Sequence, residues 1–178
     1  MIDKKTWDYR KIIDITWKLN ENTPIYPGDS VLSIENIANK EKPYINLSKI
    51  TMGSHTGTHM DAPYHMVKGG FKSDMVPLEN LIGPVVVVET HGKKVYPEDI
   101  PENGYSRILF KTEYEPYEGE FRTNFSSISR TASDKLAQLN FKLVGIDYLS
   151  IDKYNFVEPV AHWVLLGKGI TVIEALNL

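Results

Sequence analysis

Short runs of apolar residues, many of them β-branched, alternate with polar and turn-forming segments along this chain. Five runs predict strands, at residues 12–16, 45–52, 85–89, 107–111 and 143–147. The continuous valines of residues 85–89 favour a buried strand that is covered on both faces. Residues 129–140 space their apolar positions as a helix does, and Ser133 or Thr131 could cap that helix.

Near the C-terminus, residues 161–166 and 170–174 are also rich in strand-forming residues. The intervening Gly-Lys-Gly suits a hairpin turn, so we expect two antiparallel strands there. Residues 23–29 contain two prolines and a glycine and predict a rigid loop. Because strands outnumber helices, the pattern predicts an α/β fold with a mainly central mixed sheet, and the length of 178 residues fits a single domain, 1–178.

The amino-acid composition limits which binding partners and which cellular compartment are expected for this protein. A net charge of −3 and the lack of any Lys/Arg block argue against nucleic acid and membrane surfaces as partners. Met1–Arg10 has no apolar signal core, and no apolar run approaches the roughly 20 residues that span a bilayer. The absence of cysteine excludes disulfides and thiolate metal sites and fits a reducing compartment. We therefore expect a cytoplasmic protein.

Candidate chemistry is concentrated in one stretch. Three of the five histidines, His55, His59 and His65, lie within residues 53–65, and Asp61 lies among them. Without cysteine, a metal ion must be bound by histidine nitrogen and carboxylate oxygen, and this stretch supplies both. The alternative is that these histidines are surface or core residues that bind no metal. Three histidines and an aspartate so close together in the sequence favour a metal site.

The spacing of the first two histidines also predicts the local backbone. Pro63 and the glycines around His55 and His59 oppose a helix. In a straight strand the two residues would lie about 13 Å apart, whereas two nitrogens on one metal ion lie only about 3–4 Å apart. The chain must therefore bend between them. Gly57 permits that bend, and the hydroxyl of Thr58 could brace it by a hydrogen bond.

These residues resemble the signature His-x-Gly-Thr-His-x-Asp-x-Pro-x-His of the metal-dependent cyclase-like hydrolase family, which includes bacterial kynurenine formamidase and isatin hydrolase. All fixed positions are present in residues 55–65. The likeness extends to the aromatic-Pro-Gly-Asp turn at residues 26–29, to the Gly-x-Asp-x-x-Ser-x-Asp segment at 145–152, and to His162 and Glu174 as two late ligands. It covers the chain from about Ile13 to the C-terminus.

The resemblance implies the swivelling β/β/α architecture of that family and a centre with two metal ions. His55, His59 and Asp61 would hold the first ion, Asp61 would bridge, and His162 and Glu174 would complete the second. Two Zn²⁺ ions are the expectation, with Mn²⁺ as an alternative because all ligands are nitrogen or oxygen. The family likeness also implies a homo-oligomer, a dimer or larger.

Roles are also expected for three further residues, and for two of them an alternative role remains open. His65 would be the general acid/base, since an ordinary histidine titrates near neutral pH, or else a fourth ligand. Asp147 would either orient a ligand histidine or act as a capping or loop carboxylate. Tyr26 would bind substrate: kynurenine formamidases carry tryptophan before this turn, packed on an aromatic substrate, and tyrosine also offers a π-face.

The function implied is hydrolysis of an amide or formamide bond by metal-activated water. The expected reaction is that of an arylformamidase, which converts N-formyl-L-kynurenine and water into L-kynurenine and formate. Hydrolysis of a cyclic amide, as in isatin hydrolase, is the alternative within enzymes. A metal-binding member of the family without turnover is the alternative outside them.

Overall fold

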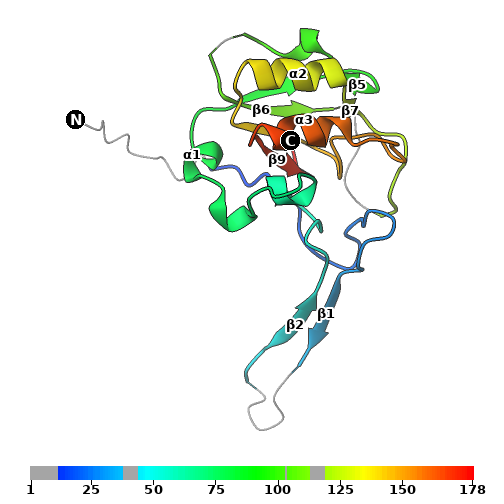
Figure 1. Cartoon of the computed structure of the whole chain (residues 1–178). Helices are drawn as coiled ribbons and strands as arrows, with labels where there is room; N and C mark the ends of the chain where they lie inside the picture. Colours follow the sequence, from blue (N-terminus) through cyan, green and yellow to red (C-terminus); the bar gives the residue numbers. More distant parts are fainter. Residues whose placement is uncertain (1–11, 38–43, 103, 113–118) are drawn as a thin grey trace, which may run out of the picture.

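A five-stranded mixed sheet forms the centre of the computed structural model (Figure 1). The structure describes residues 12–37, 44–102, 104–112 and 119–178. The strand order is β3-β9-β8-β6-β4, in which β3 runs antiparallel to β9 and all other neighbours are parallel. The strands are β3 (His59–Asp61), β4 (Val86–Glu89), β6 (Arg107–Lys111), β8 (Leu143–Ile146) and β9 (Thr171–Glu174). The predicted α/β fold with a central mixed sheet is confirmed.

Two helices, α2 (Arg130–Gln138) and α3 (Val160–Gly167), pack together over one face of this sheet. Their buried side chains form one core with the sheet residues that point the same way, among them Leu136, Leu165, Ile108, Val144 and Val172. The opposite face is covered by the ends of the described chain, through Ile15 and Leu176. The core therefore fixes α3 above β9, which matters for the site.

A two-stranded arm projects from the body of the molecule (Figure 1). It consists of β1 (Ser33–Asn36) and β2 (Ser48–Thr51), paired antiparallel, and every residue of both strands is exposed. The remaining elements are short: η2 (Pro63–His65), η3 (Ser73–Met75), α1 (Leu78–Leu81), β5 (Lys94–Val95), η4 (Pro97–Asp99) and β7 (Ser127–Ile128).

Several predicted elements lie where the sequence placed them. Strands are confirmed within residues 45–52, 85–89, 107–111 and 143–147, and the helix within 129–140. The helix is capped by Ser129, whose hydroxyl accepts from Ala132 N at 3.1 Å, rather than by Thr131 or Ser133. The valine strand β4 forms an edge of the sheet, and Val87 is 52% exposed, so the prediction that it is covered on both faces is wrong.

The prediction of a C-terminal hairpin is wrong. Residues 161–166 lie in α3, and the following β9 runs parallel to β8. Ala161, His162 and Leu165 are buried while Trp163 is 47% exposed, which is the spacing of one helix face. Apolar composition alone could not separate a short buried helix from a buried strand.

Residues 12–16 form no strand. The side chain of Asp14 accepts hydrogen bonds from the backbone N–H and the hydroxyl of Thr16, at 2.9 and 2.7 Å. This local turn competes with strand pairing. Ile12 and Ile13 are 66% and 81% exposed, so no apolar burial favours a strand there.

The predicted loop at residues 23–29 is confirmed, with a turn closed by Asp29 N donating to Tyr26 O at 3.0 Å. Met1–Arg10, predicted to lack a signal core, lies outside the described residues. The single domain spanning 1–178 stays a prediction. Within the described ranges, no helix has the length and apolar character that crossing a membrane requires.

Candidate metal centre

The pairing of β3 with β9 aligns the candidate ligands. His59 lies directly opposite Glu174, and Asp61 lies opposite Val172. Directly opposed residues share a face of the sheet, and alternate residues return to it, so the three polar side chains point to the same side. Val172 belongs to the core beneath α2 and α3, which identifies that side as the helical one. His162 on α3 therefore approaches the same point from above.

The loop before β3 bends as the ligand spacing predicts. Gly57 has φ +69°, and the bend brings Nδ1 of His55 to 3.0 Å from Nε2 of His59. The Thr58 hydroxyl accepts from Trp17 N at 3.0 Å and donates to Ala175 O. Thr58 thus braces the loop, as expected, by tying it to segments from both ends of the described chain.

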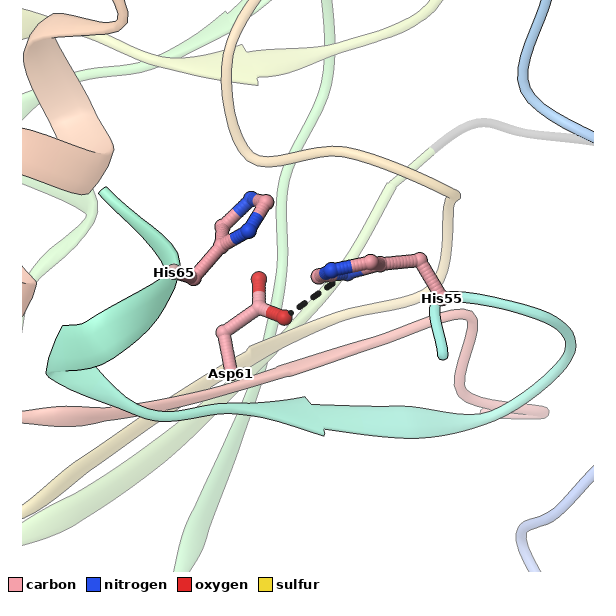
Figure 2. Close-up of side chains that lie close together, drawn as sticks. All are labelled: His55, Asp61 and His65. Atoms are coloured by element: carbon pink, nitrogen blue, oxygen red, sulfur yellow. Dashed lines mark ion pairs between the residues drawn. The ribbon is translucent and has the colours of Figure 1, made fainter. Parts of the chain in front are cut away.

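Asp61 lies at the centre of the ligand set. Its Oδ1 is 3.0 Å from His55 Nδ1 and 3.5 Å from His59 Nε2, whereas its Oδ2 is 3.5 Å from His162 Nε2. Figure 2 shows His55 and His65 directed toward this carboxylate from the loop before β3 and from η2. Among the described residues, no donor forms a hydrogen bond to either buried oxygen. A buried carboxylate without hydrogen-bond donors needs positive charge beside it, which protonated imidazoles or a bound metal ion can supply.

Glu174 closes the other side of the set. Its Oε1 is 3.2 Å from His162 Nε2, and its Oε2 is 3.5 Å from His59 Nε2. The backbone N–H of Ile151 donates to Oε1 at 2.7 Å, which fixes the carboxylate in this orientation. Glu174 is only 3% exposed, so it is no solvated strand end.

Hydrogen bonds set the tautomers of two histidines. Nδ1–H of His59 donates to the carbonyl of Gly57 at 2.9 Å, and Nδ1–H of His162 donates to Asp152 Oδ2 at 2.7 Å. Each Nε2 then faces Asp61 and Glu174, where it can give its lone pair to a metal ion that replaces its proton. Such hydrogen bonding of the far nitrogen is typical of metal-binding histidines. The residues present therefore fit a divalent ion with nitrogen and oxygen ligands.

The electrostatics of the centre agree with this fit. Burial lowers the pKa of His162, but the adjacent carboxylates of Asp152, Asp61 and Glu174 outweigh burial and raise that pKa well above its ordinary value. Burial likewise opposes ionisation of Asp61, yet the adjacent His162 and His55 lower its pKa. Carboxylates that stay ionised while buried create a negative potential that a cation would neutralise.

The ligand atoms form two groups that share Asp61. One consists of His55, Asp61 and His65, and the other of His59, Asp61 and Glu174; within each group the atoms lie within 4.8 Å of one another. Asp61 thus stands between two places where an ion could bind. The first group also includes His65, so the geometry leaves a ligand role for that residue open.

His65 lies on η2, immediately beside these groups. Its ring centroid is 4.1 Å from that of His55 and 5.7 Å from that of His162. Burial lowers the pKa of His65, and the neighbouring histidines add to this effect against the opposing charge of Asp61. A neutral imidazole at this place can accept a proton.

Tyr26 lines a cavity of about 170 Å³ that opens onto the centre, here called the aromatic chamber. The chamber is also lined by Leu149, Phe156, His55 and His65. Tyr26 packs with its ring centroid 5.0 Å from that of Phe121. Burial and the neighbouring Tyr154 raise the pKa of Tyr26, so the phenol stays protonated and can donate a hydrogen bond.

All seven predicted site residues therefore gather around one point. The alternative for Asp147 is decided in favour of a loop carboxylate, because it accepts from the backbone N–H and hydroxyl of Thr112 at 2.7 and 2.8 Å. The carboxylate that orients the candidate ligand His162 is Asp152, which stands out in the sequence only as part of the motif at residues 145–152. Asp152 also accepts from the N–H groups of Ala161 and His162, at the start of α3. A helix predicted there, starting after Pro159, would have required such a cap.

We predict that Asp152→Asn weakens divalent-metal binding by about 10- to 100-fold, because the amide no longer holds His162 in the correct tautomer. Chelator competition on the purified protein measures this affinity. Asp147→Asn is the matched control, since that buried carboxylate binds Thr112 instead, and it should leave metal affinity unchanged. Equal losses in both variants would contradict the role assigned to Asp152.

Comparison with known proteins gives consistent sequence matches. A family model described as putative cyclase matches residues 13–153. Kynurenine formamidase of Bacillus cereus is 32% identical over 168 residues, covering 91% of this chain and 80% of that protein. Kynurenine formamidase of Salinibacter ruber is 34% identical over 176 residues, covering 94% of this chain and 82% of that protein.

Solved structures show the same relationship. A potential metal-dependent hydrolase with cyclase activity has a TM-score of 0.79 and 31% identity, covering 93% of this chain and 81% of that one. Isatin hydrolase with the product analogue thioisatinate also has a TM-score of 0.79, and the match covers 93% of this chain and 79% of that one. Its sequence identity is 20%, so the match shows the shared fold alone. The resemblance inferred from residues 55–65 is confirmed, and this chain belongs to the putative cyclase family of metal-dependent hydrolases.

Proposed function

We propose that this protein is a metal-dependent hydrolase of an aryl formamide, and that it converts N-formyl-L-kynurenine and water into L-kynurenine and formate. The observation that carries the proposal is the buried Asp61 carboxylate among the nitrogens of His55, His59 and His162. The kynurenine formamidases at 32% and 34% identity support the choice of bond. The reaction would belong to tryptophan catabolism.

Two ions would share the centre. His55, His59 and Asp61 would hold the first, Asp61 would bridge, and His162 and Glu174 would hold the second. Both Asp61 oxygens face imidazole nitrogens on different sides, which supports bridging. We expect Zn²⁺, with Mn²⁺ as the alternative for an all-nitrogen-and-oxygen set.

A bound divalent ion supplies Lewis acidity, which acidifies water and polarises a carbonyl oxygen. His65 would take up the proton of the attacking water and deliver it to the leaving aniline nitrogen. Its lowered pKa keeps it unprotonated and ready to accept that proton. Tyr26 would hold the aromatic ring of the substrate, because it lines the chamber into which the centre opens.

The proposed reaction is tested by assaying the metal-analysed protein on N-formyl-L-kynurenine and on isatin side by side. We expect turnover of the formamide, its loss after chelation, and its return with Zn²⁺ or Mn²⁺. Turnover of isatin alone would favour a cyclic-amide hydrolase, for which the shared fold is the present support. Binding of metal with turnover of neither compound would contradict the proposed substrate.

We predict that His65→Ala lowers kcat by about 100- to 10,000-fold while metal content is retained, since general acid–base catalysis contributes about that factor. Elemental analysis beside the kinetics separates the two roles left open for this residue. Loss of one equivalent of metal would identify His65 as a ligand instead. Unchanged kcat with full metal content would contradict both.

The protein would act as a homo-oligomer, a dimer or larger, on a small-molecule substrate. The arm supports this, because Ile34 and Ile50 form a directly opposed pair that is 52% and 61% exposed. An isolated two-stranded hairpin is at best marginally stable in water, so a second copy of this chain is the expected cover. The cytoplasmic location stays a prediction from composition.

We predict that Ile34→Asp combined with Ile50→Asp shifts the protein toward the monomer, because charges would be buried against the second copy. Light scattering after size exclusion measures the mass over a range of concentrations. Ser33→Asp places a charge on the other face of the same strand and is the control. A monomeric wild-type protein, or equal effects of both changes, would contradict the arm's role.

A further inference from the structure

A second cavity opens onto the same histidines from another side. This polar chamber has a volume of about 360 Å³ and is lined by Ser54, Tyr64, Lys72 and Ser73. His55 and His65 line it as well as the aromatic chamber. A substrate whose reacting bond lies at these two histidines can therefore extend into both chambers.

The turn that carries His65 also positions Lys72. The turn is closed by Val67 N donating to Pro63 O at 2.8 Å and by Tyr64 N donating to Phe71 O at 3.0 Å. A Cβ at Gly70 would lie 2.5 Å from the carbonyl carbon of Pro63, so the close approach of the two sides needs glycine. The second of these hydrogen bonds brings the backbone beside Lys72 next to Tyr64.

The ammonium of Lys72 lies over the ring of Tyr64, 5.1 Å from its centroid. A cation in this position is only weakly held by the ring. Lys72 is exposed, so it can meet a ligand without breaking a buried ion pair.

Charge distinguishes the two chambers. The polar chamber is lined by one permanent cation, Lys72, beside the hydroxyls of Ser54 and Ser73, and by one carboxylate, Asp61 of the candidate metal centre. The described residues that line the aromatic chamber include Asp29 and Glu174 but neither lysine nor arginine. Lys72 is thus the lysine or arginine that these two chambers offer, so a substrate carboxylate finds its cationic partner in the polar chamber.

We propose that Lys72 binds the carboxylate of an amino-acid tail on the aryl formamide, with the tail in the polar chamber and the ring in the aromatic chamber. This inference rests on the proposed function and deepens it. In N-formyl-L-kynurenine the formamide and the acyl tail occupy neighbouring ring positions, so ring, reacting bond and tail diverge from one point. His55 and His65, shared by both chambers, mark that point. Lys72 is thus a specificity-determining residue and takes no part in bond cleavage.

The test compares two substrates and three variants of the metal-loaded full chain. N-formyl-L-kynurenine carries the tail, whereas 2′-formamidoacetophenone has the same ring, ketone and formamide but no carboxylate. Lys72→Met removes the charge and keeps the apolar stem, and Lys72→Arg restores a charge. Lys68→Met removes an exposed lysine from the same turn that does not line the polar chamber, and serves as the control.

We expect Lys72→Met to raise KM for N-formyl-L-kynurenine by about three- to tenfold, the range of a charge-assisted contact at a partly exposed site. The kcat for that substrate and both constants for 2′-formamidoacetophenone should stay within about twofold of wild type. Lys72→Arg should recover most of the loss, and Lys68→Met should show none. Inhibition by L-kynurenine should weaken in parallel with KM.

Equal rises of KM for both substrates, or no rise for either, would overturn the assignment of Lys72 while the protein remains a formamidase. Failure of the wild-type protein to hydrolyse either formamide would instead refute the proposed function, and the assignment with it. The two failures are therefore distinguished by the wild-type measurement alone.

Discussion

The structure depends on one buried charge, the carboxylate of Asp61. It is 1% exposed, it is surrounded by imidazole nitrogens, and no hydrogen bond from the described residues satisfies either oxygen. Burying an ionised group without a partner costs roughly several kcal/mol, so Asp61 needs positive charge beside it, from protonated imidazoles or from a metal ion. In the proposed centre, the other ligands are the groups that would share the metal ion with Asp61.

The pairing of the strands in the central sheet places the other candidate ligands around Asp61. Pairing of β3 with β9 sets His59 opposite Glu174, and the parallel pairing of β9 with β8 places the loop after β8 at the same edge. That loop supplies Asp152, which holds His162. A register slip of one residue would turn His59 and Asp61 to the other face, so strand pairing and ligand set specify each other.

Local features of the site could be predicted from the sequence, and non-local ones could not. The bend at Gly57 follows from two ligands four residues apart, because the distance that an extended chain covers excludes a straight strand. The helix carrying His162 was predicted as a strand, since its short apolar run has no clear period. Because no helix was predicted there, no N-terminal cap was sought, and the role of Asp152 was not predicted. A strand was predicted within residues 45–52, but its pairing with residues 33–36 into an exposed arm was not.

The ligands differ in how firmly the backbone holds them. His59, Asp61 and Glu174 lie in paired strands and His162 lies on the buried face of α3, but His55 lies in the loop that leads out of the arm. Its side chain is 28% exposed, the largest value among the ligand side chains in contact with Asp61 or Glu174. If these residues bind an ion as proposed, His55 is the ligand with the most freedom to move. It would adjust to a change in ionic radius, whereas the four side chains on strands and helix would keep their positions.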